Sequence, residues 1–96
     1  MSELERLQRN YRAAFLRYLP QRDEAALHAG YQIGRGAVAA GLSLLDLAQV
    51  HHQVLFEVIK TSPAGELDDI AAAASDFFVE VLATYDMTQR GFATGS

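Results

Sequence analysis

DFFVEVLATYDMTQRGF, residues 76–92, carries the clearest helical pattern in this 96-residue chain. Its apolar side chains recur at intervals of three and four residues, which is typical of the buried face of an α-helix. They are Phe77, Phe78, Val81, Leu82 and Tyr85. The segment ends with Arg90 and Gly91, a cation and a glycine that suit the C-terminus of a helix. We therefore predict a core-facing helix that stops near Arg90.

The same segment has a second apolar feature on another side of the predicted helix. Val79 and Ala83 lie four residues apart, in a region where Glu80 and Asp86 indicate exposure to solvent. An apolar pair among charged neighbours is typical of a surface that contacts another molecule. We expect Val79 and Ala83 to belong to such a contact surface.

The rest of the chain contains further amphipathic segments with the same periodicity. The predicted helices cover residues 2–19, 22–40, 44–60 and 64–90. Pro20 should end the first, because proline removes a backbone hydrogen bond and disfavours helix at the residue before it. Gly41 suits the C-cap of the second helix. Ser43 should begin the third, since Asp46 follows three residues later and completes a capping box.

Several glycines lie within the second predicted helix, residues 22–40. Gly30 and Gly34 form a small-xxx-small pair, which in a chain of this polarity indicates close helix packing rather than a membrane dimer. Gly34 and Gly36 flank Arg35, but no strand precedes them, as a phosphate-binding loop would require. Nucleotide binding is therefore disfavoured.

No segment has the pattern of a strand, and the connections are short. The sequence therefore predicts an all-α fold, a single domain over residues 1–96, in which four helices form a bundle with antiparallel sequence neighbours. The apolar stripes are wide for so small a bundle. We expect a homodimer that shares one stripe across a twofold axis.

Composition excludes several classes of function. The chain has 12 acidic and 8 basic residues, a net charge of −4, which disfavours nucleic acid and anionic membranes as partners. It has no cysteine, so thiolate catalysis and zinc–thiolate sites are excluded, and a reducing cytoplasm fits. No apolar run approaches the length of about 18 residues that a membrane helix needs.

No set of residues assembles a catalytic, metal or cofactor site. His51 and His52 are adjacent, so their side chains diverge by about 100° on a helix and cannot chelate one metal. His51 falls on the apolar side, where a core histidine with a hydrogen-bond partner is expected. His28 lies off the core stripe, either on a solvated surface or on a binding face shared with the last helix. Ser43 serves as a cap rather than a nucleophile.

Several short motifs, taken in order, resemble the N-terminal domain family of RsbU-type phosphatases over nearly the whole chain. The motifs are Tyr18-Leu19, Gly34-Arg35, GLSLLDL at 41–47, His51, FFVEVL at 77–82, Tyr85-Asp86-Met87 and Arg90-Gly91-Phe92. The resemblance implies an all-helical, dimeric, non-catalytic domain of bacterial partner-switching pathways. It binds a regulatory serine kinase of the RsbT type and thereby activates an attached PPM-type serine phosphatase, which releases a sigma factor for stress transcription.

In that family the kinase binds to the second and last helices. The matching positions here are Glu24, His28, Val79 and Ala83. The resemblance implies that Val79 and Ala83 supply the apolar centre of the kinase interface, while Glu24 and His28 form a polar edge that selects the partner.

Other interpretations of the chain stay open. It could be a dimerising input domain of a sensor histidine kinase or another signalling protein without an RsbT-like partner, or else a small-molecule sensor or an enzyme. The residues after position 96 would distinguish the first two, since a phosphatase domain favours one and a histidine-kinase core the other. Gly95-Ser96 could be a cloning remnant.

Overall fold

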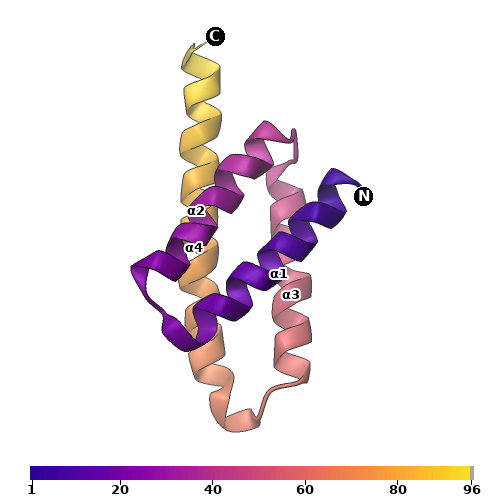
Figure 1. The fold of residues 1–96 in the computed structure, drawn as a ribbon, viewed down its shortest axis with the longest axis vertical. Helices are drawn as coiled ribbons and strands as arrows, with labels where there is room; N and C mark the ends of the chain where they lie inside the picture. The colour runs from indigo at the N-terminus through magenta and orange to yellow at the C-terminus, as the bar shows by residue number, and fades with distance from the viewer. Residues whose placement is uncertain (96) are drawn as a thin grey trace.

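The computed structural model describes residues 1–95 of the chain, with side chains as far as Gly91. Its elements are α1 (Glu3–Gln21), α2 (Glu24–Ala39), α3 (Leu44–Lys60), the 3₁₀ turn η1 (Ala64–Glu66) and α4 (Leu67–Gly95). No strand occurs among these residues, so the prediction of an all-α fold is confirmed. In Figure 1, α1 and α2 cross in front of α3 and α4, and the end of α4 projects beyond the other helices.

Side-chain caps fix the starts of the first three helices. Ser2 and Glu5 form a reciprocal capping box at α1, and Ser43 and Asp46 form another at α3, as predicted for α3. Asp23 caps α2 by accepting a hydrogen bond from the backbone N–H of Ala26 at 2.8 Å. These caps satisfy backbone donors that have no partner within the helix.

The end of α2 follows the prediction. Gly41 has a positive φ of 76°, and its N–H donates to the Val38 carbonyl. The N–H of Leu42 donates to the Ala37 carbonyl, which completes a Schellman motif. A glycine stands at this position because a side chain would be strained there.

Two predicted helix ends are wrong. Helix α1 contains Pro20 and ends at Gln21, because a proline in the last turn removes a single hydrogen bond, while Arg22 closes the turn by donating to the Tyr18 carbonyl. Helix α4 continues through Arg90 and Gly91 to Gly95. A glycine inside a helix costs about 1 kcal/mol, which is too little to end a long helix.

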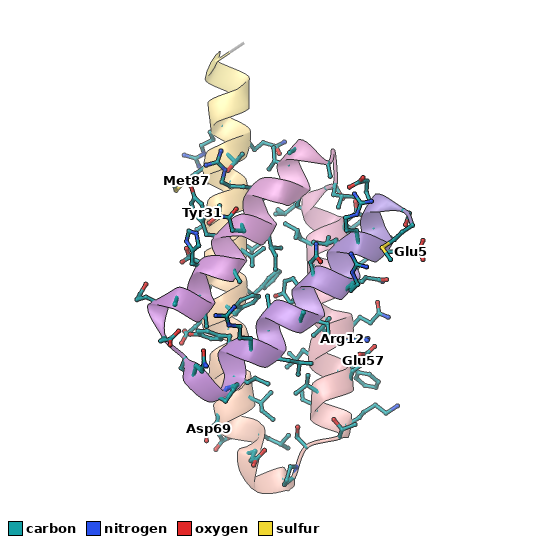
Figure 2. The ribbon with its side chains drawn as sticks, viewed as in Figure 1. Glu5, Arg12, Tyr31, Glu57, Asp69 and Met87 are labelled. Carbon is teal, nitrogen blue, oxygen red and sulfur yellow. The ribbon has the colours of Figure 1, made fainter. Side chains whose placement is uncertain are left out.

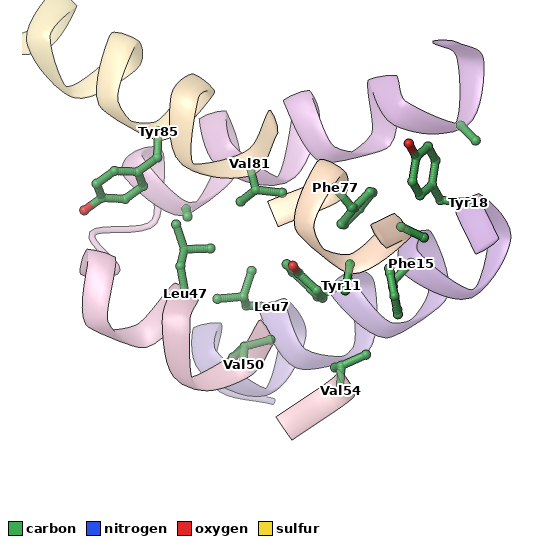
Figure 3. Close-up of a cluster of buried hydrophobic side chains, with 14 residues drawn as sticks. Leu7, Tyr11, Phe15, Tyr18, Leu47, Val50, Val54, Phe77, Val81 and Tyr85 are labelled. Carbon is green, nitrogen blue, oxygen red and sulfur yellow. The ribbon is translucent and has the colours of Figure 1, made fainter. Parts of the chain in front are cut away.

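The core forms around Phe77 of α4 (Figure 3). The Tyr11 ring meets it edge-on at 5.3 Å between centroids, and Phe15 and Tyr18 pack at 5.8 and 5.6 Å. The other large, fully buried side chains are Leu47, Val50 and Val81. The apolar stripes predicted for α1, α3 and α4 therefore meet in one cluster.

Helices α2 and α4 make the most extensive helix–helix contact in the described chain. Gly34 permits this approach, since a Cβ atom there would lie 2.6 Å from the Val81 carbonyl oxygen and 2.9 Å from Thr84 Cβ. At Gly30 a Cβ atom would lie 3.3 Å from the Phe77 ring. The prediction that these glycines serve close packing is confirmed.

Candidate partner-binding surface

The two predicted contact residues of α4 lie on its outer side. Phe77 and Val81 point into the core, and the helical period turns Val79 and Ala83 away from it. Val79 is 61% exposed, which is high for a β-branched apolar side chain, and Ala83 is exposed beside it. Both residues are therefore free to contact another molecule.

The two predicted residues of α2 are also exposed. Glu24 lies in the first turn of the helix, and His28 follows one turn later. The His28 ring stacks on Tyr31 at 5.2 Å between centroids, with 15° between the planes, and its Nε2 lies 3.1 Å from Nε2 of Gln32. These contacts hold the imidazole along the helix surface.

The structure thus places the predicted residues in two pairs, one on each of two helices that pack together. No hydrogen bond, ion pair or ring contact joins the pairs in the described part of the chain. The roles of Glu24, His28, Val79 and Ala83 remain predictions, because their exposure fits a docking surface without identifying what binds there.

A groove next to these residues was missed by the sequence reasoning. It lies between α2 and α4, has a volume of about 390 Å³ and is lined by Tyr31, Arg35, Thr84, Met87, Thr88 and Gly91. Figure 2 shows Tyr31 and Met87 on the same side of the molecule. Met87 is 68% exposed and continues the spacing of Val79 and Ala83 by another four residues. That spacing was a signal that could have identified Met87, though not the groove.

Arg35 adds a positive charge to the edge of this groove. Its guanidinium donates to the Tyr31 hydroxyl at 3.0 Å and lies 5.7 Å from the centre of the same ring. Together with the stacked His28, it forms a ladder of three side chains along α2. We define the α2/α4 surface as the residues Glu24, His28, Tyr31, Arg35, Val79, Ala83 and Met87. It combines an apolar strip on α4 with a polar, aromatic edge on α2.

His51 has a structural role, as predicted. Its Nδ1 lies 2.7 Å from the Tyr11 hydroxyl oxygen, and its ring stacks on Phe78 at 3.9 Å with 3° between the planes. Burial, with a smaller contribution from the neighbouring His52, lowers the pKa of His51 to about 4. Burial also raises the pKa of Tyr11. Both groups are therefore neutral near pH 7 and form a hydrogen-bonded contact between α1 and α3.

The described residues contain neither a metal-binding cluster nor a membrane-spanning helix. No group of three or more His, Asp or Glu side chains among them is arranged to hold a metal ion. None of their helices combines the length and apolar character of a membrane span.

The fold and this surface define an all-helical domain with an exposed face built from its second and last helices. A family model described as the N-terminal domain of the phosphoserine phosphatase RsbU matches residues 9–88. The chain therefore belongs to this family, which confirms the resemblance found in its motifs. The match is to the N-terminal domain and not to the catalytic phosphatase domain. No curated protein and no solved structure gives a significant match.

Proposed function

We propose that this domain is a non-catalytic regulatory module that dimerises and binds a serine kinase of the RsbT type. Binding activates an attached PPM-type serine phosphatase that controls a stress sigma factor. Membership of the RsbU N-terminal family supports the regulatory role. The proposal includes two further features. Helices adjacent in sequence run antiparallel in the bundle, and two copies of the domain form a homodimer.

The observation that carries the proposal is the exposed apolar strip on α4. Val79 and Met87 are 61% and 68% exposed, with Ala83 between them. Protein interfaces place apolar side chains at the centre and polar groups around them. The strip would form that centre, and His28 and Arg35 on α2 would form the polar edge.

Helix α4 offers a route from the docking surface to an output domain. It carries Val79 and Ala83 in its middle and continues without a break to Gly95. At 1.5 Å per residue, the helix extends about 24 Å beyond Val79. A kinase that binds at Val79 would change the position or pairing of this helix, and an attached phosphatase would respond to that change.

A calorimetric titration with the RsbT-type kinase of the same organism tests this proposal. We expect micromolar or tighter binding, weakened about 30-fold or more by Val79→Asp, because the charge would be buried at the centre of the interface. Ala13→Asp is the matched control, since Ala13 is exposed on α1. Equal binding by both variants would contradict docking at Val79.

The second candidate is a dimerising input domain without an RsbT-like partner. This second candidate predicts a stable dimer that shows no heat of binding when it is titrated with the kinase. The sequence that follows position 96 in the gene provides an independent check. A phosphatase domain there supports the first candidate, and a histidine-kinase core supports the second.

A further inference from the structure

Helix α3 carries an exposed stripe that no part of the described chain covers. Leu47, Val50 and Val54 face the core, and the opposite side of the helix is open. Leu45 and Phe56 are 66% and 57% exposed there. We define the α3 stripe as the exposed residues Leu45, Gln49, His52, Phe56 and Ile59. Its apolar members have no core residue to pack against.

The spacing of the α3 stripe is that of a helix–helix seam. Its members follow one another at intervals of four, three, four and three residues. This is the a/d pattern by which two helices pack along their lengths. The stripe therefore has the periodicity to receive a second helix rather than a flat surface or a small ligand.

The carboxylates of α3 are kept away from the stripe, while the Lys60 ammonium lies 5.3 Å from the centre of the Phe56 ring. The chain as a whole is acidic, with 12 carboxylates against 8 basic residues, so two copies repel each other in general. On α3, however, Asp46 caps its own helix and Glu57 pairs with Arg12 of α1. No carboxylate belongs to the stripe itself. A second acidic copy can therefore approach α3 at the stripe without repulsion between carboxylates.

We infer that the α3 stripe is the homodimer interface, with α3 packed antiparallel against α3 of a second copy. In the register that centres the twofold axis between Gln49 and His52, Leu45 faces Phe56 of the second copy and Gln49 faces its His52. Apolar side chains then meet apolar ones, and an amide meets an imidazole. A parallel pair would instead place each stripe residue beside its own copy, so that His52 would meet His52.

This interface leaves the α2/α4 surface open. Helix α3 packs on α1 and α4, and the proposed kinase contacts lie on α2 and the outer side of α4. In Figure 1, α2 crosses in front of α4, and α3 lies beside α4. The inference depends on the dimer part of the proposed function and not on the kinase. One domain could therefore bind a second copy and a kinase together.

Disulfide cross-linking tests the register directly, because the chain has no native cysteine. Leu45→Cys and Phe56→Cys proteins, mixed and mildly oxidised, should form a mixed disulfide, and neither alone should cross-link efficiently. In the antiparallel pair the two copies of residue 45 lie about 16 Å apart along the axis. A disulfide needs Cα atoms within about 7 Å. Circular dichroism confirms that each variant keeps its helices.

Val79→Cys is the matched control, since Val79 is 61% exposed and Leu45 is 66% exposed. Efficient cross-linking of Leu45→Cys with itself would overturn the antiparallel register. Cross-linking through Val79→Cys instead would place the interface on α4. A dimer that cross-links at none of these positions would overturn the interface and keep the proposed homodimer. A monomer at tens of micromolar would overturn both, while kinase binding would still be decided by titration.

A charged substitution gives a second measurement. Phe56→Glu would bury a carboxylate from each copy, and we expect the dissociation constant of the dimer to rise about 100-fold or more. Met87→Glu places the same charge at a residue that is 68% exposed on α4, and should leave the dimer intact. Light scattering across a dilution series measures both variants. Equal effects, or an effect of Met87→Glu alone, would overturn the inference.

Discussion

The Tyr11 hydroxyl oxygen and Nδ1 of His51 lie 2.7 Å apart and join α1 to α3 by a side-chain hydrogen bond. The His51 ring also stacks on Phe78 of α4. One imidazole therefore holds three helices together, even though it is polar. A partly buried polar pair of this kind specifies the packing, because each partner loses its hydrogen bond if the helices shift.

Tyr11→Phe should destabilise the domain. The change keeps the ring in its edge-on contact with Phe77 and removes the hydroxyl, so Nδ1 of His51 loses its partner. We expect a loss of about 1 to 2 kcal/mol in the free energy of unfolding. Urea denaturation measures it. Tyr31→Phe is the control at an exposed hydroxyl and should change stability by less than about 0.5 kcal/mol. Similar losses in both variants would contradict a special role for the Tyr11–His51 pair.

Stability should fall as the pH drops from about 6.5 to about 4. The pKa of His51 is about 4 in the folded chain against a usual value of 6.5, so the unfolded chain binds a proton first. Below pH 4 both states are protonated and this contribution no longer changes. Because the ring is only partly buried, we expect a total loss of about 1 to 2 kcal/mol.

Thermal or urea unfolding at a series of pH values checks this dependence. His51→Gln cannot titrate in this range, so the part of the slope due to His51 should disappear in that variant. The same slope in both proteins would show that other groups cause it.

Gly34→Ala should be strongly destabilising. The new methyl group would lie 2.6 Å from the Val81 carbonyl oxygen, which belongs to the backbone of α4 and cannot turn aside. We expect a loss of about 2 kcal/mol or more. Gly36→Ala provides the opposite case, because nothing lies within 4 Å of the added atom. It should stabilise the domain by about 0.5 to 1 kcal/mol. Urea unfolding of the two variants should therefore give changes of opposite sign.

Ser43→Ala should weaken the start of α3. It removes the acceptor for the backbone N–H of Asp46 and breaks the capping box. The expected cost is about 1 kcal/mol in the free energy of unfolding. Ser75→Ala is the control, since Ser75 is exposed in the middle of α4. The prediction fails if the two serine variants unfold at the same urea concentration.

The limits of a helix could be predicted where a capping residue determines them and no other interaction opposes it. The capping pair Ser43 and Asp46 and the cap glycine Gly41 gave helix limits within a residue or two of those observed. The ends at Pro20 and Gly91 were wrong because each residue removes only part of the helix stability. The length of a helix depends on all its contacts, and sequence rules weigh one residue at a time.

The candidate surface was predicted in part. The helical period, together with the charged neighbours Glu80 and Asp86, predicted that Val79 and Ala83 face outward, and both are exposed. Tyr31 was not predicted to belong to this surface, and its place in a groove with Met87 could not be predicted. That groove depends on how closely α2 approaches α4. This distance depends on both helices together, and the sequence pattern of neither helix predicts it.

The contact at Gly34 also bears on how this domain could change its partner. Because α2 meets the backbone of α4 there without an intervening side chain, the spacing of the two helices does not depend on the residues they expose. Side chains along the outer edges of both helices can then be exchanged without deforming the platform beneath them. New partner preferences would arise through surface substitutions alone, while the shape presented to every partner stays the same.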